Sequence, residues 1–362
     1  MTRPLFLSDN ASPAHPEILA ALGGTVGEHL TSYGDDPLTR SAERRIREFF
    51  DRDCGVYFVY NGTGANVAAL RTVTRPFEAV ICTEMAHINE DEAGACEAIG
   101  GFKLLPLDRR DGRLSPEDLD LFAGRRGFEH TSQPAVVSLT QATEVGTIYT
   151  PDHLRRLCDK AHSLDMVVHM DGARIANAAV SWRERARREG RDPTPAQALR
   201  EISCDAGIDV LSFGATKNGL LFGEAVLFFD RALEESFRFF RKQTTQLHSK
   251  MRYIAVQFER YLRDDLWFAN AARANSLAAR LGGAVTGLPG VEQAHPVEAN
   301  GVFLHLPPSV IPALQDEFGF YLWDESTHLA RLMVSWDSTE EVVDAFAARC
   351  RELCLKYAHP CV

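Results

Sequence analysis

Short apolar runs alternate with longer amphipathic segments over the first 248 residues of the chain. The runs are rich in β-branched and aromatic residues and do not alternate strictly with polar ones, which is typical of strands buried on both faces of a sheet. Such strands, separated by helices, predict an α/β fold with a mostly parallel central sheet flanked by helices. The predicted strands are Val56–Tyr60, Ala79–Cys82, Ala135–Leu139, Met166–His169, Val210–Phe213 and Glu224–Phe229.

The segments between these runs carry helix signals. Asn66–Thr72 is amphipathic, and Pro151–Leu164 follows Thr150 as an N-cap and has proline at its first position. After residue 248 the pattern changes to a long helical stretch, short strands and a closing helix. We therefore expect a large domain over residues 1–248, N-terminal segment included, and a smaller α+β domain over 249–362. The later elements are predicted at Lys250–Asp265, around Val302–Leu306 and Arg331–Ser335, and from about Thr339 to Tyr357.

The chain has 362 residues and a formal net charge of -11 at pH 7. An acidic protein lacks the basic field that binding to nucleic acid or to an anionic membrane requires. No apolar run approaches the roughly 18 residues of a membrane-spanning helix, and the first residues lack the apolar segment of a secretion signal. Together with eight scattered cysteines, these features predict a cytoplasmic protein with reduced thiols and neither kind of partner.

Two clusters of polar residues have ordinary explanations. Cys350, Cys354, His359 and Cys361 could ligate zinc, but their spacing lacks the pattern of a structural zinc site. The first two fit the buried stripe of the closing helix, so we predict no metal. The basic run Arg183–Arg191 fits a solvated surface helix or insertion better than a recognition patch.

The stretch "YNGTGAN", Tyr60–Asn66, follows the first predicted strand and opens a helix. Glycines allow close backbone approach, and the N–H groups at a helix start bind phosphate oxygens. The stretch lacks the dinucleotide fingerprint and a Walker lysine, so it fits a single phosphate group better than a dinucleotide or a nucleoside triphosphate. A plain tight connection from strand to helix is the alternative.

Asp171 and Lys217 lie at the ends of two successive predicted strands. A strand-end carboxylate can pair with a cationic ring nitrogen, or it can simply cap the following helix. Lys217, in "SFGATKNG", has small neighbours that leave space for a ring, and a sheet-edge pocket beside another cation would lower its pKa. A phosphate turn, an aspartate and a lysine in this order are what pyridoxal phosphate requires of a protein.

Further motifs extend this pattern over nearly the whole chain: "FLSDN" at 6–10, "YGDDP" at 33–37, "NGTGAN" at 61–66, "AHINEDEAGA" at 86–95, "QATEVGT" at 141–147, "HMDGAR" at 169–174, "FGATKNG" at 213–219, "PVEANGVFL" at 296–304 and "RLMVSWD" at 331–337. With this ordered set the chain resembles the threonine aldolase family of fold-type-I pyridoxal-phosphate enzymes. The bacterial low-specificity L-threonine aldolase branch, with its "SDN" and "TKNG", is the most similar. The resemblance implies an aspartate-aminotransferase-like fold.

The resemblance implies a role for each matched residue around the cofactor. Lys217 would bind pyridoxal phosphate as a Schiff base, and Asp171 would pair with its pyridine nitrogen. The N–H groups of Gly62 and Thr63 would hold the phosphate. His87 would stack on the ring and is a candidate for handling the proton of the substrate's β-hydroxyl; a histidine capping a loop is the alternative.

The same resemblance implies the groups that bind the substrate. Ser8, Arg174 and Arg331 would hold the substrate carboxylate, because the arginine fork binds a carboxylate at two atoms. Arg174 would also contact the cofactor. His130 aligns with a second active-site histidine of the family. Three further residues match family positions near the cofactor: Lys242, Arg252 and Tyr33. In one arrangement the two cations, Lys242 and Arg252, come from a neighbouring subunit.

The implied activity is cleavage of an L-β-hydroxy-α-amino acid to glycine and an aldehyde, which makes the chain a carbon–carbon lyase. Lys217 and Asp171 would equally serve transaldol transfer, β-elimination, racemisation or transamination, and a non-catalytic sensor of the same ligand is a further alternative. The family is oligomeric, so we expect a homodimer or homotetramer with sites between subunits. The stretch after Arg174, which includes Arg183–Arg191, is longer than the family pattern and would reshape the pocket if it folded towards the site.

Overall fold

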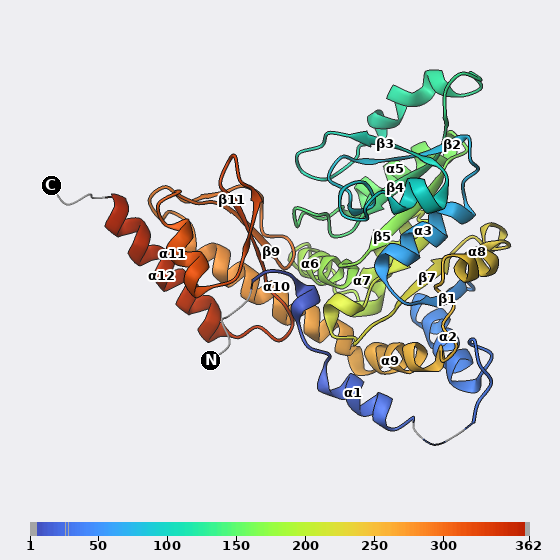
Figure 1. Cartoon of the computed structure of the whole chain (residues 1–362), viewed down its shortest axis with the longest axis horizontal. Coiled ribbons are helices and arrows are strands. Elements are labelled where there is room, and N and C mark those ends of the chain that lie inside the picture. Colours follow the sequence, from blue (N-terminus) through green and yellow to red (C-terminus); the bar gives the residue numbers. More distant parts are fainter. Residues whose placement is uncertain (1–5, 26, 28, 359–362) are drawn as a thin grey trace.

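The structure, a computed structural model, describes residues 6–25, 27 and 29–358. Figure 1 shows a large body around one sheet and, at the left, a smaller body around a second sheet. The large sheet has seven strands in the order β1-β7-β6-β5-β4-β2-β3. Their bounds are β1 Gly55–Val59, β2 Glu78–Thr83, β3 Lys103–Leu107, β4 Gln133–Thr140, β5 Val167–Gly172, β6 Val210–Phe213 and β7 Glu224–Phe228.

The strand directions bring several strand ends to one edge of this sheet. From β3 through β2, β4 and β5 to β6 all neighbours are parallel, whereas β7 is antiparallel to both β6 and β1. The carboxyl ends of β1, β2, β4, β5 and β6 therefore meet the amino end of β7. Ligands of open α/β sheets bind outside the carboxyl ends of the strands, which makes this edge the place to look for a site.

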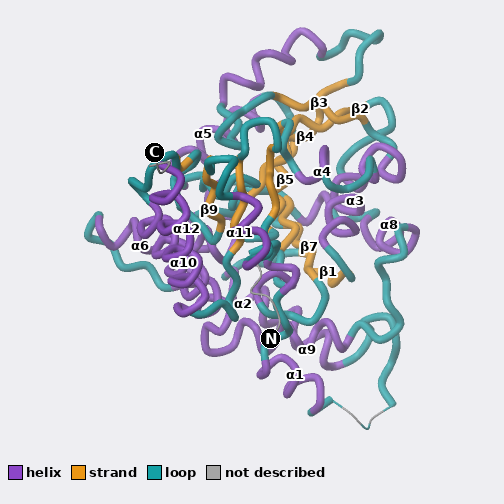
Figure 2. The backbone as a smooth tube through the Cα atoms, turned by 60° about the vertical axis from the view of Figure 1, so that its left-hand side comes forward, coloured by secondary structure: helices purple, strands orange, loops and turns teal. Residues whose placement is uncertain are grey.

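Helices cover both faces of the large sheet. Figure 2 shows α3 and α8 on one side of the strands and α5 and α6 on the other. Buried side chains of α2, α5, α6, α7 and α9 join one large hydrophobic cluster, while those of α3 and α8 pack on the opposite face. The bounds are α1 Pro16–Gly23, α2 Pro37–Phe50, α3 Gly62–Thr72, α4 His87–Glu90, α5 Pro151–Ser163, α6 Ile175–Arg188, α7 Pro195–Glu201, α8 Phe237–Gln243 and α9 Arg252–Leu262.

The smaller sheet is fully antiparallel, in the order β10-β11-β9-β8, and has its own hydrophobic core. Phe6 lies in this core, and its backbone bonds to the small body through Gly319 and Met333, at 2.6 and 2.9 Å. The N-terminal segment thus runs along the junction between the two bodies. The bounds are α10 Leu266–Val285, β8 Glu292–Gln293, β9 Gly301–His305, α11 Ile311–Glu317, β10 Tyr321–Asp324, β11 Leu329–Met333 and α12 Glu340–Ala358.

The fold class expected from the sequence is confirmed, one local prediction is wrong, and one strand of the large sheet was missed. The expected continuous helix Lys250–Asp265 ends early: α9 stops at Leu262, and Asp264 and Asp265 take φ of 55° and 53° before α10 begins. β3 was not predicted because it is a short edge strand that contains Pro106, and proline weakens a strand signal.

The basic run Arg183–Arg191 forms the exposed end of α6 and the turn after it, as a solvated helix would. Arg183 and Arg187 both pair with Asp192, at 3.2 and 2.7 Å. Cys350 and Cys354 are buried with sulfur atoms 4.0 Å apart, and the other two residues of that cluster, His359 and Cys361, lie outside the described residues. None of the described helices is long and apolar enough to cross a membrane.

Candidate active site

A cavity of about 300 Å³ opens at the sheet edge where the strand ends meet. Its walls come from the turn after β1, the start of α3, α4, the ends of β4, β5 and β6, and the start of β7. None of its lining residues belongs to the basic run at the end of α6. The titratable and amide groups around it are Asn10, Asn61, Asn66, His87, Glu92, Glu144, Asp171, Arg174, Lys217 and Glu224.

Lys217 lies in a single turn of 3₁₀ helix, Thr216–Asn218, directly after β6. Burial and the nearby charge of Arg174 lower the pKa of Lys217, which favours the neutral, nucleophilic amine. The turn is fixed on its far side by the Asn218 amide, which donates to the Tyr261 hydroxyl and to the carbonyl of Trp267, both at 2.7 Å. A lysine held this way can present its amine to a carbonyl.

Asp171 is buried at the end of β5, on the cavity wall. Its Oδ1 accepts from the backbone N–H of Ala173 at 2.9 Å, and its Oδ2 from the Asn66 amide at 2.8 Å. The next inward residue on the same face of β5, His169, lies between the hydroxyls of Ser138 and Ser212, at 2.9 and 3.0 Å. Burial lowers the pKa of His169 to about 4, so this layer carries no charge beneath the aspartate.

His87 is the first residue of α4 and reaches the cavity from the end of β2. Its Nδ1 lies 2.9 Å from Oε1 of the buried Glu92, and the Asn66 amide donates to the same oxygen at 2.9 Å. The hydrogen bond to Glu92 raises the pKa of His87, while burial opposes it. Asn66 therefore links the Glu92–His87 pair to Asp171. Sequence reasoning missed Asn66 and Glu92, although both lie inside the motifs "NGTGAN" and "AHINEDEAGA".

The first turn of α3 forms the opposite wall, with the N–H groups of Gly62 and Thr63 at the helix start. Asn61 caps the helix by accepting from Gly64 N at 2.8 Å. A Cβ on Gly62 would meet no atom within 4 Å, so open space lies beside this backbone. A Cβ on Gly64 would lie 2.0 Å from the side chain of Gln246, which packs against the turn. The arrangement is suited to a phosphate group.

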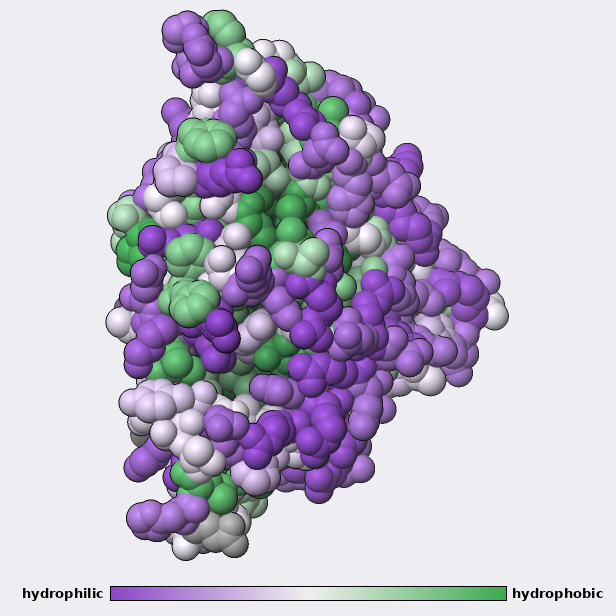
Figure 3. Space-filling model, turned by 90° about the vertical axis from the view of Figure 1, so that its right-hand side faces the viewer, coloured by the Kyte–Doolittle hydropathy of each residue, from purple (hydrophilic) through white to green (hydrophobic). Residues whose placement is uncertain are grey.

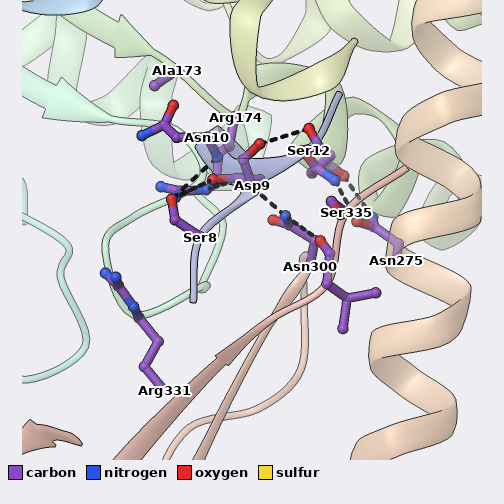
Figure 4. A network of polar contacts seen from close by, with 12 residues as sticks. Ser8, Asp9, Asn10, Ser12, Ala173, Arg174, Asn275, Asn300, Arg331 and Ser335 are labelled. Atoms are coloured by element: carbon purple, nitrogen blue, oxygen red, sulfur yellow. Dashed lines mark hydrogen bonds and ion pairs between the residues drawn. The ribbon is translucent and has the colours of Figure 1, made fainter. Parts of the chain in front are cut away.

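Figure 4 shows the polar cluster where the N-terminal segment meets the cavity. The Asp9 carboxylate accepts from Arg174 at two atoms, Nε at 2.7 Å and Nη2 at 2.9 Å, and from the Asn300 amide at 3.1 Å. Burial opposes ionisation of Asp9, but the charges of Arg174 and Lys217 outweigh it and lower its pKa to about 2. Asp9, which sequence reasoning left without a role, thus neutralises Arg174.

Arg331, on β11, is placed differently from Arg174. Its guanidinium points towards the segment that carries Ser8 (Figure 4), where Nη2 makes a long contact of 3.4 Å to the carbonyl of Leu7. Its Nε is buried and has no hydrogen-bond partner among the described residues. Burial and the charge of Arg174 lower the pKa of Arg331. A buried cation without a carboxylate partner is suited to receive one from a ligand.

Arg331 and the remaining predicted residues do not line this cavity. Ser8 caps the short turn after it and lines a neighbouring cavity of about 220 Å³. His130 is 74% exposed in the loop before β4, at the amino end of that strand and thus at the opposite edge of the sheet. Lys242 lies 4.8 Å from the ring of the exposed Tyr33, and Arg252 contacts Tyr253 at the start of α9.

Comparison with known proteins places these features in a family. The family described as beta-eliminating lyase matches residues 6–307. A low specificity L-threonine aldolase of Pseudomonas sp. (strain NCIMB 10558) is 42% identical over 96% of this chain and 96% of its own. The chain belongs to the threonine aldolase family. Membership makes it a pyridoxal-phosphate-dependent lyase, as the sequence predicted.

Two other relatives bear on the fold and on the range of the family. A Leishmania major threonine aldolase structure superposes with a TM-score of 0.88 at 30% identity, covering 97% of this chain and 99% of that one. An alanine racemase of Cochliobolus carbonum is 30% identical over 64% of this chain and 55% of its own. Related sequences are thus found in proteins named for different reactions.

The residues of this threonine aldolase family member fit pyridoxal phosphate. The cavity combines a lysine whose pKa is lowered, a buried carboxylate held by two donors and a helix start beside open space. Lys217 would bind the aldehyde, Asp171 would face the ring nitrogen, and Gly62 and Thr63 would hold the phosphate. The fit rests on groups from three separate strand ends that converge on one cavity.

Proposed function

We propose that the chain cleaves L-β-hydroxy-α-amino acids of the threonine type to glycine and an aldehyde. The observation that carries the proposal is the cavity itself, in which Lys217, Asp171 and His87 converge with Arg174. The 42% identity to a low specificity L-threonine aldolase over 96% of the chain supports it. Threonine, allo-threonine and phenylserine are the candidate substrates.

Three groups would bind and orient the reactants. The bound cofactor supplies an electron sink for negative charge at Cα of the amino acid. Asp171 keeps the ring nitrogen protonated, and Lys217 provides the amine that holds the ring. Arg331, beside Ser8, binds the substrate carboxylate. Arg174 shapes this end of the cavity, but its fork is already held by Asp9, so we assign it the positioning of Asp9 and the cofactor rather than bidentate binding of substrate.

His87 would take the proton of the β-hydroxyl, directly or through a water molecule. Its Nδ1 is bonded to Glu92, which leaves Nε2 as the basic atom. His130 was predicted as an alternative base, and its position at the opposite edge of the sheet removes it from the cavity of its own chain. Within one chain, the proton therefore goes to His87.

A second candidate is racemisation of a small amino acid, favoured by the 30% identity to the alanine racemase of Cochliobolus carbonum. The same lysine and aspartate would serve it, since both reactions place negative charge at Cα. The two activities differ in product, because only cleavage releases an aldehyde.

The test is a panel of L-threonine, L-allo-threonine, L-phenylserine and L-alanine with the holoenzyme. Aldehyde release is followed by a coupled dehydrogenase, and D-alanine by chiral chromatography. We expect aldehyde and glycine in equal amounts from one or more β-hydroxy substrates. D-Alanine without any aldehyde would establish the racemase instead. If neither aldehyde nor D-alanine is formed, both candidate activities are rejected for these substrates.

We further propose that the enzyme is a cytoplasmic homodimer or homotetramer with sites completed between subunits. Figure 3 shows apolar side chains gathered in the middle of the face that carries α8. Large apolar side chains near the cavity mouth are half exposed, among them Tyr60 and Leu221, both at 48%. Such exposure supports an interface. Light scattering measures the oligomer, and a monomer that cleaves substrate at full rate would refute the shared site.

A further inference from the structure

Glu224 is a buried carboxyl group in the cavity to which the proposed reaction assigns no role. It is the first residue of β7, which is antiparallel to its neighbours, so it lies at the same edge as the ends of β1 and β6. It pairs in register with Val59 of β1, and Ala225 beside it pairs with Phe213 of β6. Glu224 therefore lies between the turn that carries Gly62 and the turn that carries Lys217.

The contacts of Glu224 join it to the Lys217 turn. Its Oε2 accepts from the backbone N–H of Ala215 at 2.6 Å, and the Thr216 hydroxyl donates to the carbonyl of Gly223, the residue before Glu224, at 3.2 Å. Ala215 and Thr216 are the two residues directly before Lys217. The turn is thus fixed by Glu224 on one side and by the Asn218 amide on the other.

The carboxylates that act on Lys217 are not equivalent. Asp9 is bound at both oxygens by Arg174, and Asp171 accepts from Asn66 and Ala173 and faces the ring nitrogen. Glu224 forms no ion pair with another side chain among the described residues. Burial raises the pKa of Glu224 to about 7, with Lys217 opposing the shift and Asp171 adding to it. Near neutral pH this carboxyl group can both give and accept a proton.

We propose that Glu224 is the proton-exchange partner of Lys217 through a bridging water molecule in the cavity that both residues line: its carboxylic acid gives a proton to Nζ by way of the water when the amine is released, and its carboxylate takes the proton back the same way when the amine must be neutral to form a bond. The exchange converts COOH and NH₂ into COO⁻ and NH₃⁺ and needs no other reactant. Lys217 also lies near Arg174, Asp9, Asp171 and His87. Asp9 is paired with Arg174, Asp171 is assigned to the ring nitrogen and His87 is bonded to Glu92, so Glu224 is the group left to exchange the proton. The exchange serves any amine chemistry at Lys217 and rests on the proposed function only for its place in a catalytic cycle.

The test measures the Lys217 amine in cofactor-free protein, where no turnover contributes. Acetic anhydride labels neutral amines, and mass spectrometry of the peptide that contains Lys217 gives its rate at each pH, relative to the exposed Lys103. The variant is Glu224→Gln, whose amide oxygen can still accept from Ala215. The matched control is Glu144→Gln, because Glu144 is also buried, also lines the cavity and also accepts from a backbone N–H, that of His87 at 3.0 Å.

We expect Glu224→Gln to lower the pKa of Lys217 and to speed its labelling by at least about threefold above pH 7, where the negative charge of the wild-type carboxylate favours the ammonium form of Lys217. The two proteins should converge below pH 7, where Glu224 is protonated, and Glu144→Gln should follow the wild type. A Glu224→Gln profile equal to that of the wild type, or one changed by the same factor at every pH, would overturn the proposal. If Glu224→Gln does not fold, Glu224→Asp should shift the profile in the same direction and by less, and an unshifted profile refutes the exchange. Failure of the aldehyde assay leaves this readout unaffected.

Discussion

The two ends of the cavity are built in different ways. The cofactor end, formed by Gly62, Asp171 and Lys217, comes from strand ends of one sheet and the turns that follow them. The carboxylate end, formed by Arg174 on the cavity wall with Asp9 and Arg331 beyond it, brings together the N-terminal segment, the start of α6 and β11 of the smaller sheet (Figure 4). One sheet edge fixes the first end, whereas the second depends on how three distant segments pack.

The cofactor end carries out the reaction, whereas the carboxylate end binds the substrate. Groups at the cofactor end are placed by backbone hydrogen bonds of the large sheet, which resist small rearrangements. At the carboxylate end an ion pair and one amide hold the segments together, because Asp9 bonds to both Arg174 and Asn300. Changes at the first end should abolish activity in a folded protein, and changes at the second should alter substrate affinity or stability.

The largest effect is expected at the cofactor end. Lys217→Ala removes the amine that holds the cofactor, so aldehyde release should fall by roughly a thousandfold or more, the size typical for loss of a covalent nucleophile. The variant should unfold at no lower denaturant concentration than the wild type, because removing the Lys217 amine relieves the cost of its burial. Cleavage at the wild-type rate would contradict the assignment of this residue.

Arg331→Leu is expected to have the next largest effect, and Arg174→Leu is its matched comparison. Loss of Arg331 should reduce kcat/KM by roughly a hundredfold, mostly through KM, since truncating one partner of a buried charge pair costs about 2–5 kcal/mol. Loss of Arg174 should instead lower the free energy of unfolding by about 3–5 kcal/mol, because Asp9 would remain buried without its partner. Equal changes in kcat/KM and in the free energy of unfolding for the two variants would contradict the assignment of Arg331 to substrate binding and of Arg174 to the ion pair with Asp9.

Asp9→Asn tests the ion pair from the other side. It leaves Arg174 buried without a counter-charge and should lower the free energy of unfolding in urea at neutral pH by about 3 kcal/mol. The pKa of Asp9 is lowered from 3.8 to about 2, so its contribution is complete above pH 3.8 and is lost as the pH falls to 2, an effect of about 2 kcal/mol. The gap between wild type and variant should therefore narrow across this window; a constant gap would show that the charge of Asp9 is not what stabilises the fold.

The smallest effect is expected from Glu92→Gln. Its hydrogen bond raises the pKa of His87, so the variant should move the acid limb of the kcat profile to lower pH. The rate at the optimum should fall only a few-fold, because Nε2 remains available. Asn89→Ala provides the control, because Asn89 is half-buried on the same short helix and its amide donates to the carbonyl of Glu84 and not to the His87–Glu92 pair. An acid limb that does not move would exclude His87 as the group that sets it.

The two ends also differ in how far the sequence predicts them. Lys217 and Asp171 follow apolar runs that can only be buried strands, so their convergence follows from strand direction alone. Asp9 could not be assigned, because its partner Arg174 lies far along the chain and neither helix nor strand periodicity links them. Glu224 was read as the start of a strand, and only the antiparallel direction of β7 places it beside Lys217. Roles at such positions depend on packing that a one-dimensional pattern does not contain.

The close contact of two turns at the cofactor end limits how this enzyme can be altered. A Cβ at Gly214 would lie 2.5 Å from Cα of Ala173, so the backbone before Lys217 touches the backbone after Asp171. Displacing either turn must displace the other. Libraries that aim to change the accepted aldehyde should therefore leave residues 171–174 and 214–217 untouched as one block, and vary the walls formed by Tyr60 and Phe222, which line the same cavity.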